Sequence, residues 1–225
     1  MPSTVFLLSP ANCSGRRAQL LLRRGGSLEM ARRLRSREGA PLGELFAFIS
    51  GLYFRGKLAY ARAFADEGAG QGVPRVLVIT PHRGLLPWDH SVRLATVRAF
   101  ARVDIHPGER RYTAPLRRSA RALAAAAGSA SRFVLLGSVA TGKYVEVLDE
   151  ALGGRLTFPV EFVGRGDMSR GGLMLRCARE GRELTYVRAV GALRHGPRPA
   201  RLERLPRANP PAAVNACADE RRDIP

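Results

Sequence analysis

The sequence predicts an α/β fold, a three-layer sandwich in which helices cover both faces of a largely parallel central sheet. Short runs rich in Val, Leu and Ile alternate with longer segments whose apolar residues recur at helical spacing. This alternation is typical of parallel sheets, because a parallel pair needs a crossover that is usually a helix. With 225 residues, 45% of them hydrophobic, the chain can also bury a sizeable core.

Five segments have the length and composition of buried strands. They cover residues 4–8, 75–80, 132–137, 156–160 and 184–190. Helical spacing predicts helices over 43–65, 91–102, 113–127, 143–152 and 173–179, with a loop and a short helix over 25–40. Gly51 or Gly56 is expected to interrupt the first helix, Asp89 or Ser91 to cap the second, and Gly153 to end the fourth.

The predicted domain organisation is a single α/β domain over 1–195 and a mostly irregular tail over 196–225, which is rich in Pro and Arg and lacks periodicity. No apolar run approaches the roughly 18 residues of a spanning helix, and the run 5–8 is too short for a signal peptide. We therefore expect no membrane partner and a cytoplasmic location. Cys13, Cys177 and Cys217 lack the paired spacing of a zinc site, so we expect reduced thiols, no metal and no cofactor.

The strongest compositional signal is a net charge of +18. A basic surface attracts polyanions, which favours nucleic acid as a partner, with DNA ahead of RNA. However, the chain has 35 arginines and two lysines, a ratio typical of a GC-rich genome, so part of the charge is ordinary solvated surface. The two lysines, Lys57 and Lys143, are candidates for positions that require a compact ammonium group.

Four loops follow predicted strands and are the candidate site. They cover 9–15, 81–89, 138–142 and 164–172. Because the carboxyl ends of parallel strands lie at one edge of a sheet, these loops can converge on one site. Small residues from Gly137 to Gly142 precede a helix start and Lys143, which suits an oxyanion, although Tyr144 stands where a Walker loop needs Ser or Thr.

Three kinds of role are predicted at this edge. The residues expected to hold phosphate or nucleic acid are Ser9, Lys57, Arg83, Ser138, Thr141, Gly142, Lys143, Arg165 and Arg170. Those expected to stack on a base are Tyr53, Trp88 and Tyr144. Those expected to position water or contact a base edge in catalysis are Asn12, His82 and Asp89.

Each motif also has a structural interpretation. Asp89 can be a helix cap and Trp88 a core aromatic residue, while 137–143 can be a tight turn and 164–172 a flexible connection. Ser9 lies outside a G-x-S-x-G motif and has no evident His partner, which disfavours a hydrolase triad.

The order of these motifs resembles the YaaA (peroxide stress, DUF328) and DUF6884-like families. The resemblance rests on FLLSPA at 6–11, GLYFRGK at 51–57 with Tyr60, ITPHRGLLPWD at 79–89, and LGS at 136–138 followed by Lys143 and Tyr144. It implies a fold related to the uracil-DNA glycosylase superfamily and a role with nucleic acids or nucleobases. The Arg-rich insertion near 16–40 and the Pro/Arg tail depart from these families.

Three functions fit these observations. The leading hypothesis is a nucleic-acid-binding, DNA glycosylase-like enzyme that acts on the N-glycosidic bond of a flipped or single-stranded nucleotide. The second is a non-catalytic DNA-binding protein that protects DNA in stress. The third is an enzyme that acts on free nucleotides or nucleosides.

Overall fold

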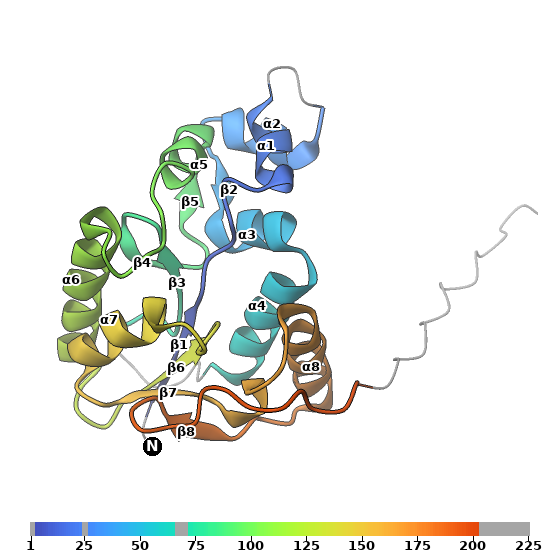
Figure 1. Cartoon of the computed structure of the whole chain (residues 1–225). Helices are drawn as coiled ribbons and strands as arrows, with labels where there is room; N and C mark the ends of the chain where they lie inside the picture. Colours follow the sequence, from blue (N-terminus) through green and yellow to red (C-terminus); the bar gives the residue numbers. More distant parts are fainter. Residues whose placement is uncertain (1–2, 24–26, 66–71, 203–225) are drawn as a thin grey trace, which may run out of the picture.

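A mixed α/β architecture surrounds one six-stranded sheet (Figure 1). The computed structural model describes residues 3–23, 27–65 and 72–202. The sheet order is β4-β3-β1-β6-β7-β8, and its central strands β3, β1, β6 and β7 are parallel, while β4 and β8 run antiparallel at the edges. Their bounds are Thr4–Leu8 (β1), Val76–Thr80 (β3), Gly84–Pro87 (β4), Arg132–Leu136 (β6), Leu156–Pro159 (β7) and Tyr186–Arg188 (β8).

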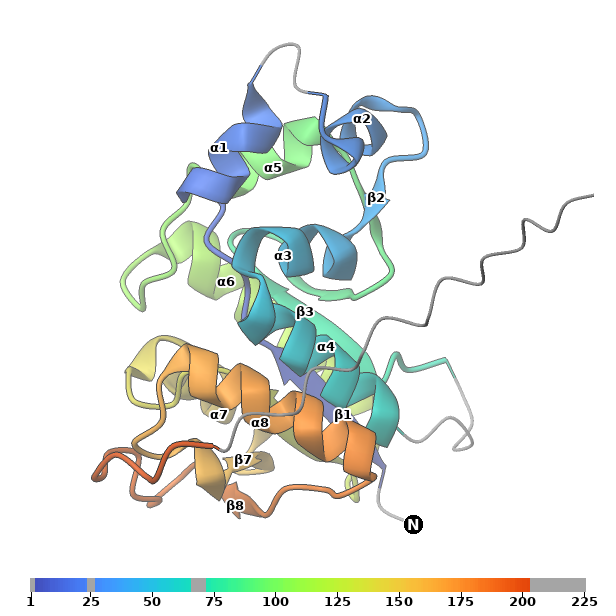
Figure 2. The same cartoon turned by 90° about the vertical axis from the view of Figure 1, so that its right-hand side faces the viewer.

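Helices cover both faces of this sheet. The helices α6 (Arg110–Ala126) and α7 (Gly142–Leu152) pack on one face, and α3 (Leu42–Ser50), α4 (Leu52–Phe64) and α8 (Asp167–Glu180) on the other (Figures 1 and 2). Alternate residues of β1 serve the two cores, because side chains of a strand alternate between faces. Phe6 and Leu8 join the core beneath α4 and α8, whereas Val5 and Leu7 join the core beneath α6 and α7.

A small group of elements lies beyond the carboxyl ends of the parallel strands (Figure 1). It contains α1 (Arg16–Leu22), α2 (Glu29–Arg35), α5 (Leu94–Phe100) and the two-stranded ribbon of β2 (Ala40–Pro41) with β5 (Ser91–Val92). Because α1 and α2 follow β1 while α5 follows β4, the group joins segments that are far apart in the sequence. It forms one wall of the site described below.

Several predicted elements are confirmed. The strand at 4–8 and the strand before Gly137 are present, and the long helix at 43–65 is interrupted at Gly51, whose φ of 62° favours glycine. Gly153 ends α7 in the left-handed conformation, as expected for a glycine after a helix. The tail residues 196–202 carry no helix or strand, and 203–225, with Cys217, lie outside the described residues. Within the described ranges, no helix is long and apolar enough to cross a membrane.

The prediction of a loop over 81–89 is wrong, because most of this segment belongs to a β-hairpin. The Thr80 hydroxyl accepts a hydrogen bond from the Arg83 amide and donates one to the Gly84 carbonyl, which closes a tight turn. A side chain at Gly84 would place its Cβ 2.5 Å from the Pro115 carbonyl oxygen, so α6 packs directly on the turn. Strand β4 then runs back along β3 and carries Trp88 and Asp89 to the opposite end of that strand.

Two other boundaries differ from prediction. The helix expected over 91–102 is limited to α5, Ser91 belongs to β5, and Arg93 occupies the N-cap position that Asp89 or Ser91 was expected to fill. The segment 164–172 is a loop only as far as Gly166, because α8 begins at Asp167. Glycines that suggested a loop there instead allow close helix packing.

That close packing occurs where α4 crosses α8. A Cβ at Gly56 would lie 2.5 Å from the Gly171 carbonyl oxygen, and a Cβ at Gly171 would lie 2.8 Å from the Leu52 carbonyl oxygen and the Tyr53 Cα. The two backbones therefore touch without intervening side chains. This contact sets the position of Tyr53 and Lys57 relative to Asp167 and Arg170.

We predict that Gly171→Ala lowers the free energy of unfolding by about 1–3 kcal/mol, because the added methyl group forces the two helices apart. Gly172→Ala is the matched control, since its Cβ would meet only the Leu202 side chain at 3.6 Å. That neighbouring change should be neutral or stabilising by up to ~1 kcal/mol through helix propensity. Urea unfolding of both variants is the measurement, and equal losses of stability would contradict the prediction.

Candidate functional site

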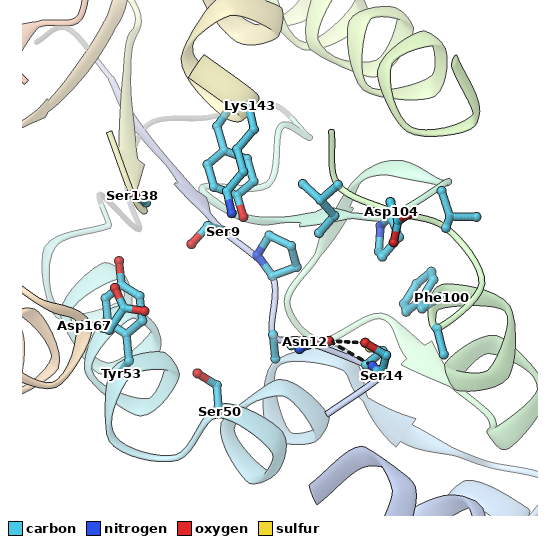
Figure 3. A pocket seen from close by; sticks show the side chains of 18 residues that line it. Ser9, Asn12, Ser14, Ser50, Tyr53, Phe100, Asp104, Ser138, Lys143 and Asp167 are labelled. Atoms are coloured by element: carbon cyan, nitrogen blue, oxygen red, sulfur yellow. Dashed lines mark hydrogen bonds between the residues drawn. The ribbon is translucent and has the colours of Figure 1, made fainter. Parts of the chain in front are cut away.

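A cavity of about 380 Å³ opens at the carboxyl end of the central strands (Figure 3). All four predicted segments reach it, through Ser9 to Ser14 after β1, Pro81 after β3, Ser138 after β6, and Asp167 at the start of α8. The predicted convergence of strand-end segments is thus observed. The remaining lining comes from α3, α4, the stretch from Phe100 to Ile105, and the start of α7.

The sheet topology explains why a cavity forms there. From β1 the chain crosses to β3 over the face that holds α3 and α4, whereas from β6 it crosses to β7 over the face that holds α7. The segments after β1 and β6 therefore leave in opposite directions and open a crevice between adjacent strands, which is where open α/β sheets bind ligands. Gly137 lets the strands approach, because its Cβ would lie 2.8 Å from the Ser9 Cβ.

Ser9 lies at the base of this crevice and is held by Lys57. The Lys57 Nζ donates to the Ser9 carbonyl oxygen at 2.6 Å and contacts the Ser9 Oγ at 2.9 Å. The Lys57 side chain is 1% exposed and lies over the rings of Tyr53 and Phe54, 4.3 and 4.8 Å from their centroids. Lys57 thus lies beneath the cavity and does not line it, so it is not placed to hold phosphate.

The surroundings of Lys57 disfavour its charged form. Burial is the main cause that lowers the pKa of the amine to about 7, while Asp167 acts to raise it and Arg170 acts to lower it. Among the described residues no carboxylate forms an ion pair with Lys57. The amine is therefore largely neutral in mildly alkaline solution.

Two tyrosines, Tyr53 and Tyr144, present buried phenol groups to the cavity. The Tyr53 hydroxyl has no hydrogen-bond partner among the described residues, and burial raises its pKa to about 12. Burial likewise raises the pKa of Tyr144, and the Ser9 side chain opposes this shift at both phenols. Both groups stay protonated near neutral pH and can donate hydrogen bonds into the cavity.

The charged residues of the lining are Lys143, Asp104 and Asp167. Lys143 lies in the first turn of α7, whose backbone amides receive no side-chain cap, so its charge adds to the positive end of the helix dipole. Asp167 lies 3.6 Å from Arg170, whose guanidinium donates twice to the Phe162 carbonyl. Arg170 is buried and occupied by these contacts, so it anchors α8 and does not face a ligand.

Asn12 reaches the cavity with its side chain already engaged. Its Oδ1 accepts hydrogen bonds from the Ser14 amide at 3.0 Å and the Ser14 hydroxyl at 2.7 Å (Figure 3). This Asx turn shapes the segment after β1. The structure thus shows a loop-forming role for Asn12 beside its position in the lining.

Of the predicted site residues, the structure brings Ser9, Asn12, Tyr53, Ser138, Lys143 and Tyr144 together at the cavity. The other predicted site residues do not line it, namely Lys57, His82, Arg83, Trp88, Asp89, Thr141, Gly142, Arg165 and Arg170. His82 packs edge-on against Phe100, and Trp88 packs against the core with Arg62 over its ring. Asp89 is exposed at the far end of β3.

The sequence reasoning missed two acidic residues of the lining. Asp167 lies in a segment that was predicted as a site for its glycines and arginines. Its carboxylate at the start of a helix was a signal that could have identified it as a site residue. Asp104 lies between α5 and α6 without a motif around it, and only the tertiary fold brings it to the cavity. Within the described ranges no group of His, Cys, Asp or Glu could hold a metal ion.

A second hollow lies along α8, and its lining shares no residue with that of the cavity. It has a volume of about 810 Å³, and its lining includes Leu52 and Gly166, the chain neighbours of Tyr53 and Asp167. Its lining includes no acidic residue but five arginines, namely Arg165, Arg176, Arg179, Arg198 and Arg201. We call this hollow the arginine groove.

Comparison with models of known families, with curated proteins and with solved structures finds no match to this chain.

We predict that the free energy of unfolding rises between pH 7 and 9 because of Lys57. The folded amine loses its proton near pH 7, whereas the unfolded amine keeps it up to the ordinary value of 10.5. Between these values the unfolded state binds more protons, so raising the pH favours folding, by at most about 1.4 kcal/mol per pH unit. Above pH 9 Cys13 acts oppositely, since burial raises the pKa of its thiol from 9.0 to about 12.

Urea unfolding at several pH values between 7 and 9 measures this slope. Lys57→Met should abolish the Lys57 part of the slope, while Lys143→Met, which removes the other lysine of the chain, should keep it. A slope that persists in Lys57→Met would show that another group causes it.

Proposed function

We propose that this protein binds nucleic acid, with DNA favoured over RNA, and acts on the N-glycosidic bond of one flipped or single-stranded nucleotide. The observation that carries the proposal is a cavity with a basic groove close by, since the two linings contain neighbouring residues at the starts of α4 and α8. A volume of about 380 Å³ falls in the range of small-molecule sites and suits a single nucleotide. The arginine groove offers charge to the phosphates of the flanking strand.

The lining suggests a role for each part of that nucleotide. Lys143 and the amides at the start of α7 suit the phosphate, and the rings of Tyr53 and Tyr144 suit the base. Asp167 suits the sugar, because glycosidic cleavage develops positive charge there that a carboxylate stabilises. This assignment replaces the roles expected for Asp89, His82 and Trp88, which lie outside the cavity.

We further propose that the fold is related to the uracil-DNA glycosylase superfamily, as the motif resemblance implies. Supporting this relation are the parallel core, the helices on both faces and the cavity at the end of β1 and β6. A solved structure of the complex with an oligonucleotide would test it directly.

We predict that Arg176→Ala together with Arg179→Ala weakens binding of a single-stranded DNA oligonucleotide. No described residue pairs with the side chains of these arginines, so their charge is free for phosphate. Losing two phosphate contacts on a single strand should reduce the slope of log affinity against log salt by about 1.4. Fluorescence anisotropy over a salt series measures both the affinity and the slope.

The matched control removes the same charge from α6, by Arg117→Ala with Arg121→Ala. These arginines already pair with Glu150, so their removal should change the slope little. Equal losses in the two double variants would mean that net charge alone drives binding. Affinity that is flat across salt would overturn the nucleic-acid proposal.

We predict that incubation with oligonucleotides that carry damaged or deaminated bases leaves an abasic site that alkali cleaves. Asp167→Asn should reduce the rate by at least about a hundredfold, because the neutral amide no longer stabilises the positive charge that develops on the sugar. Asp89→Asn is the control and should leave the rate unchanged, since Asp89 lies at the other end of β3. Product analysis on denaturing gels is the measurement.

Tight binding without any abasic product would instead support the non-catalytic DNA-binding function. A melting shift with free nucleosides, without oligonucleotide affinity, would support an enzyme of free nucleotides. Each outcome therefore separates one of the three functions from the other two.

A further inference from the structure

The contact between Ser9 and Lys57 has no part in the proposed glycosidic reaction. The two side-chain atoms, Oγ and Nζ, are 2.9 Å apart, and the Nζ is also fixed by the Ser9 carbonyl oxygen at 2.6 Å. Ser9 is 4% exposed, and that small exposure lies in the cavity lining. A hydroxyl that faces a cavity and contacts a buried amine on its inner side has the arrangement of a nucleophile with its base.

The amine can accept a proton from Ser9 in its neutral form. A neutral Nζ keeps two N–H bonds and one lone pair, so one N–H can serve the carbonyl oxygen while the lone pair receives the Ser9 hydroxyl proton. The groups that face Lys57 and Ser9 are Tyr53 from the same helix, Asp167 and Arg170 from α8, and Tyr144 from α7. Burial lowers the pKa of Lys57 to about 7, which leaves it mostly neutral above that pH.

The two phenols complete the arrangement. Tyr53 is 7% exposed and its hydroxyl has no partner among the described residues, although it lies at the cavity. A buried donor without a partner is costly, and an oxyanion in the cavity would satisfy it. Tyr144 lies on the other side of the same crevice, on α7.

We propose that Ser9 is a nucleophile toward carboxylic esters, with Lys57 as its general base and the phenols of Tyr53 and Tyr144 as oxyanion donors. The Ser9 proton passes to the Lys57 Nζ while the Oγ bonds to the carbonyl carbon. The bond to the leaving alcohol then breaks, and the alcohol oxygen takes the proton from Nζ. Water next attacks the acyl carbon and gives one proton to Nζ, which returns it to the Oγ as the acyl bond breaks and the carboxylic acid leaves.

The surroundings of the Ser9 Oγ suit a neutral carbonyl. Once Lys57 is neutral, the groups around this oxygen are an uncharged amine and two uncharged phenols, while the charges of Asp167, Arg170 and Lys143 lie nearby. A neutral carbonyl gains hydrogen bonds from the phenols only as its oxygen becomes negative, which favours the transition state over the bound ester.

The test uses the full chain with p-nitrophenyl acetate and a fluorophosphonate probe. We expect a burst of p-nitrophenolate close to one per protein molecule, an acetyl adduct in the intact mass, and fluorophosphonate attached to the peptide that contains Ser9. In the last reaction the Oγ–P bond forms, fluoride leaves and Lys57 takes the proton. The labelling rate should rise with pH to a plateau, with a midpoint near pH 7.

Three variants test the roles of the pair. Ser9→Ala should abolish labelling, and Lys57→Met should reduce its rate at least about a hundredfold, the usual effect of losing a general base. Ser50→Ala is the matched control, since this serine of α3 also lines the cavity but has no hydrogen bond to a lysine, and it should label as the parent does. Circular dichroism and melting show whether each variant folds.

Labelling at another residue, or a rate that keeps rising in proportion to hydroxide between pH 7 and 9, would overturn the proposal. The site of labelling and the pH midpoint come from the unaltered protein, so they decide the question even if Lys57→Met does not fold. The proposal is also independent of the nucleic-acid function. Ser9 labelling without oligonucleotide affinity would retain this inference and reject that function, and the reverse result would do the opposite.

Discussion

The arrangement of the site depends on the contact of one buried amine with the end of the first strand. Lys57 ties α4 to β1 through the Ser9 carbonyl oxygen and also touches the Ser9 hydroxyl. A fully buried charge without a paired carboxylate would be strongly destabilising, so the fold favours a neutral amine. The contact in turn requires the glycine crossing of α4 and α8 at Gly56 and Gly171, since side chains there would move α4 away from its place. The close approach of the α4 and α8 backbones therefore determines where the Lys57 amine lies.

This constraint also explains why the cavity combines residues from such distant parts of the chain. Ser9 is fixed from within the core, Tyr53 is fixed on the same helix as Lys57, and Asp167 is placed by α8 across the glycine contact. On the opposite wall, α7 brings Lys143 and Tyr144, and the Tyr112 hydroxyl on α6 donates to the Lys143 carbonyl. Helices thus hold Tyr53, Asp167, Lys143 and Tyr144 on both sides of the crevice, and a site that orients a ligand needs such rigid support.

The parts of the fold that local sequence controls were predictable, and the parts that depend on distant contacts were not. The strand at 4–8 and the end of α7 at Gly153 follow from composition and from a single glycine. The hairpin after β3 was missed because its turn depends on the Thr80 hydroxyl and on α6 packing at Gly84. The same error misplaced Trp88 and Asp89. Lys57 was selected as one of only two lysines in the chain, and the structure shows its amine buried beneath the cavity in contact with Ser9. The contact of Ser9 with Lys57 was likewise not predictable, because it depends on how α4 packs against the end of β1.

The arginines that give the chain its large positive charge fall into groups according to what each side chain contacts. Arg35, Arg155 and Arg170 donate to backbone carbonyls at the ends of helices and loops, so they serve as structural donors whatever genome bias supplied them. Arg117 and Arg121 are neutralised in part by Glu150. The arginine groove differs, since Arg176 and Arg179 have no partner among the described residues and no carboxylate is part of the groove's lining. The net charge alone therefore says little about a polyanion. A local excess of unpaired arginines beside a nucleotide-sized cavity says more, because only charge without an internal partner can exchange counterions for phosphates.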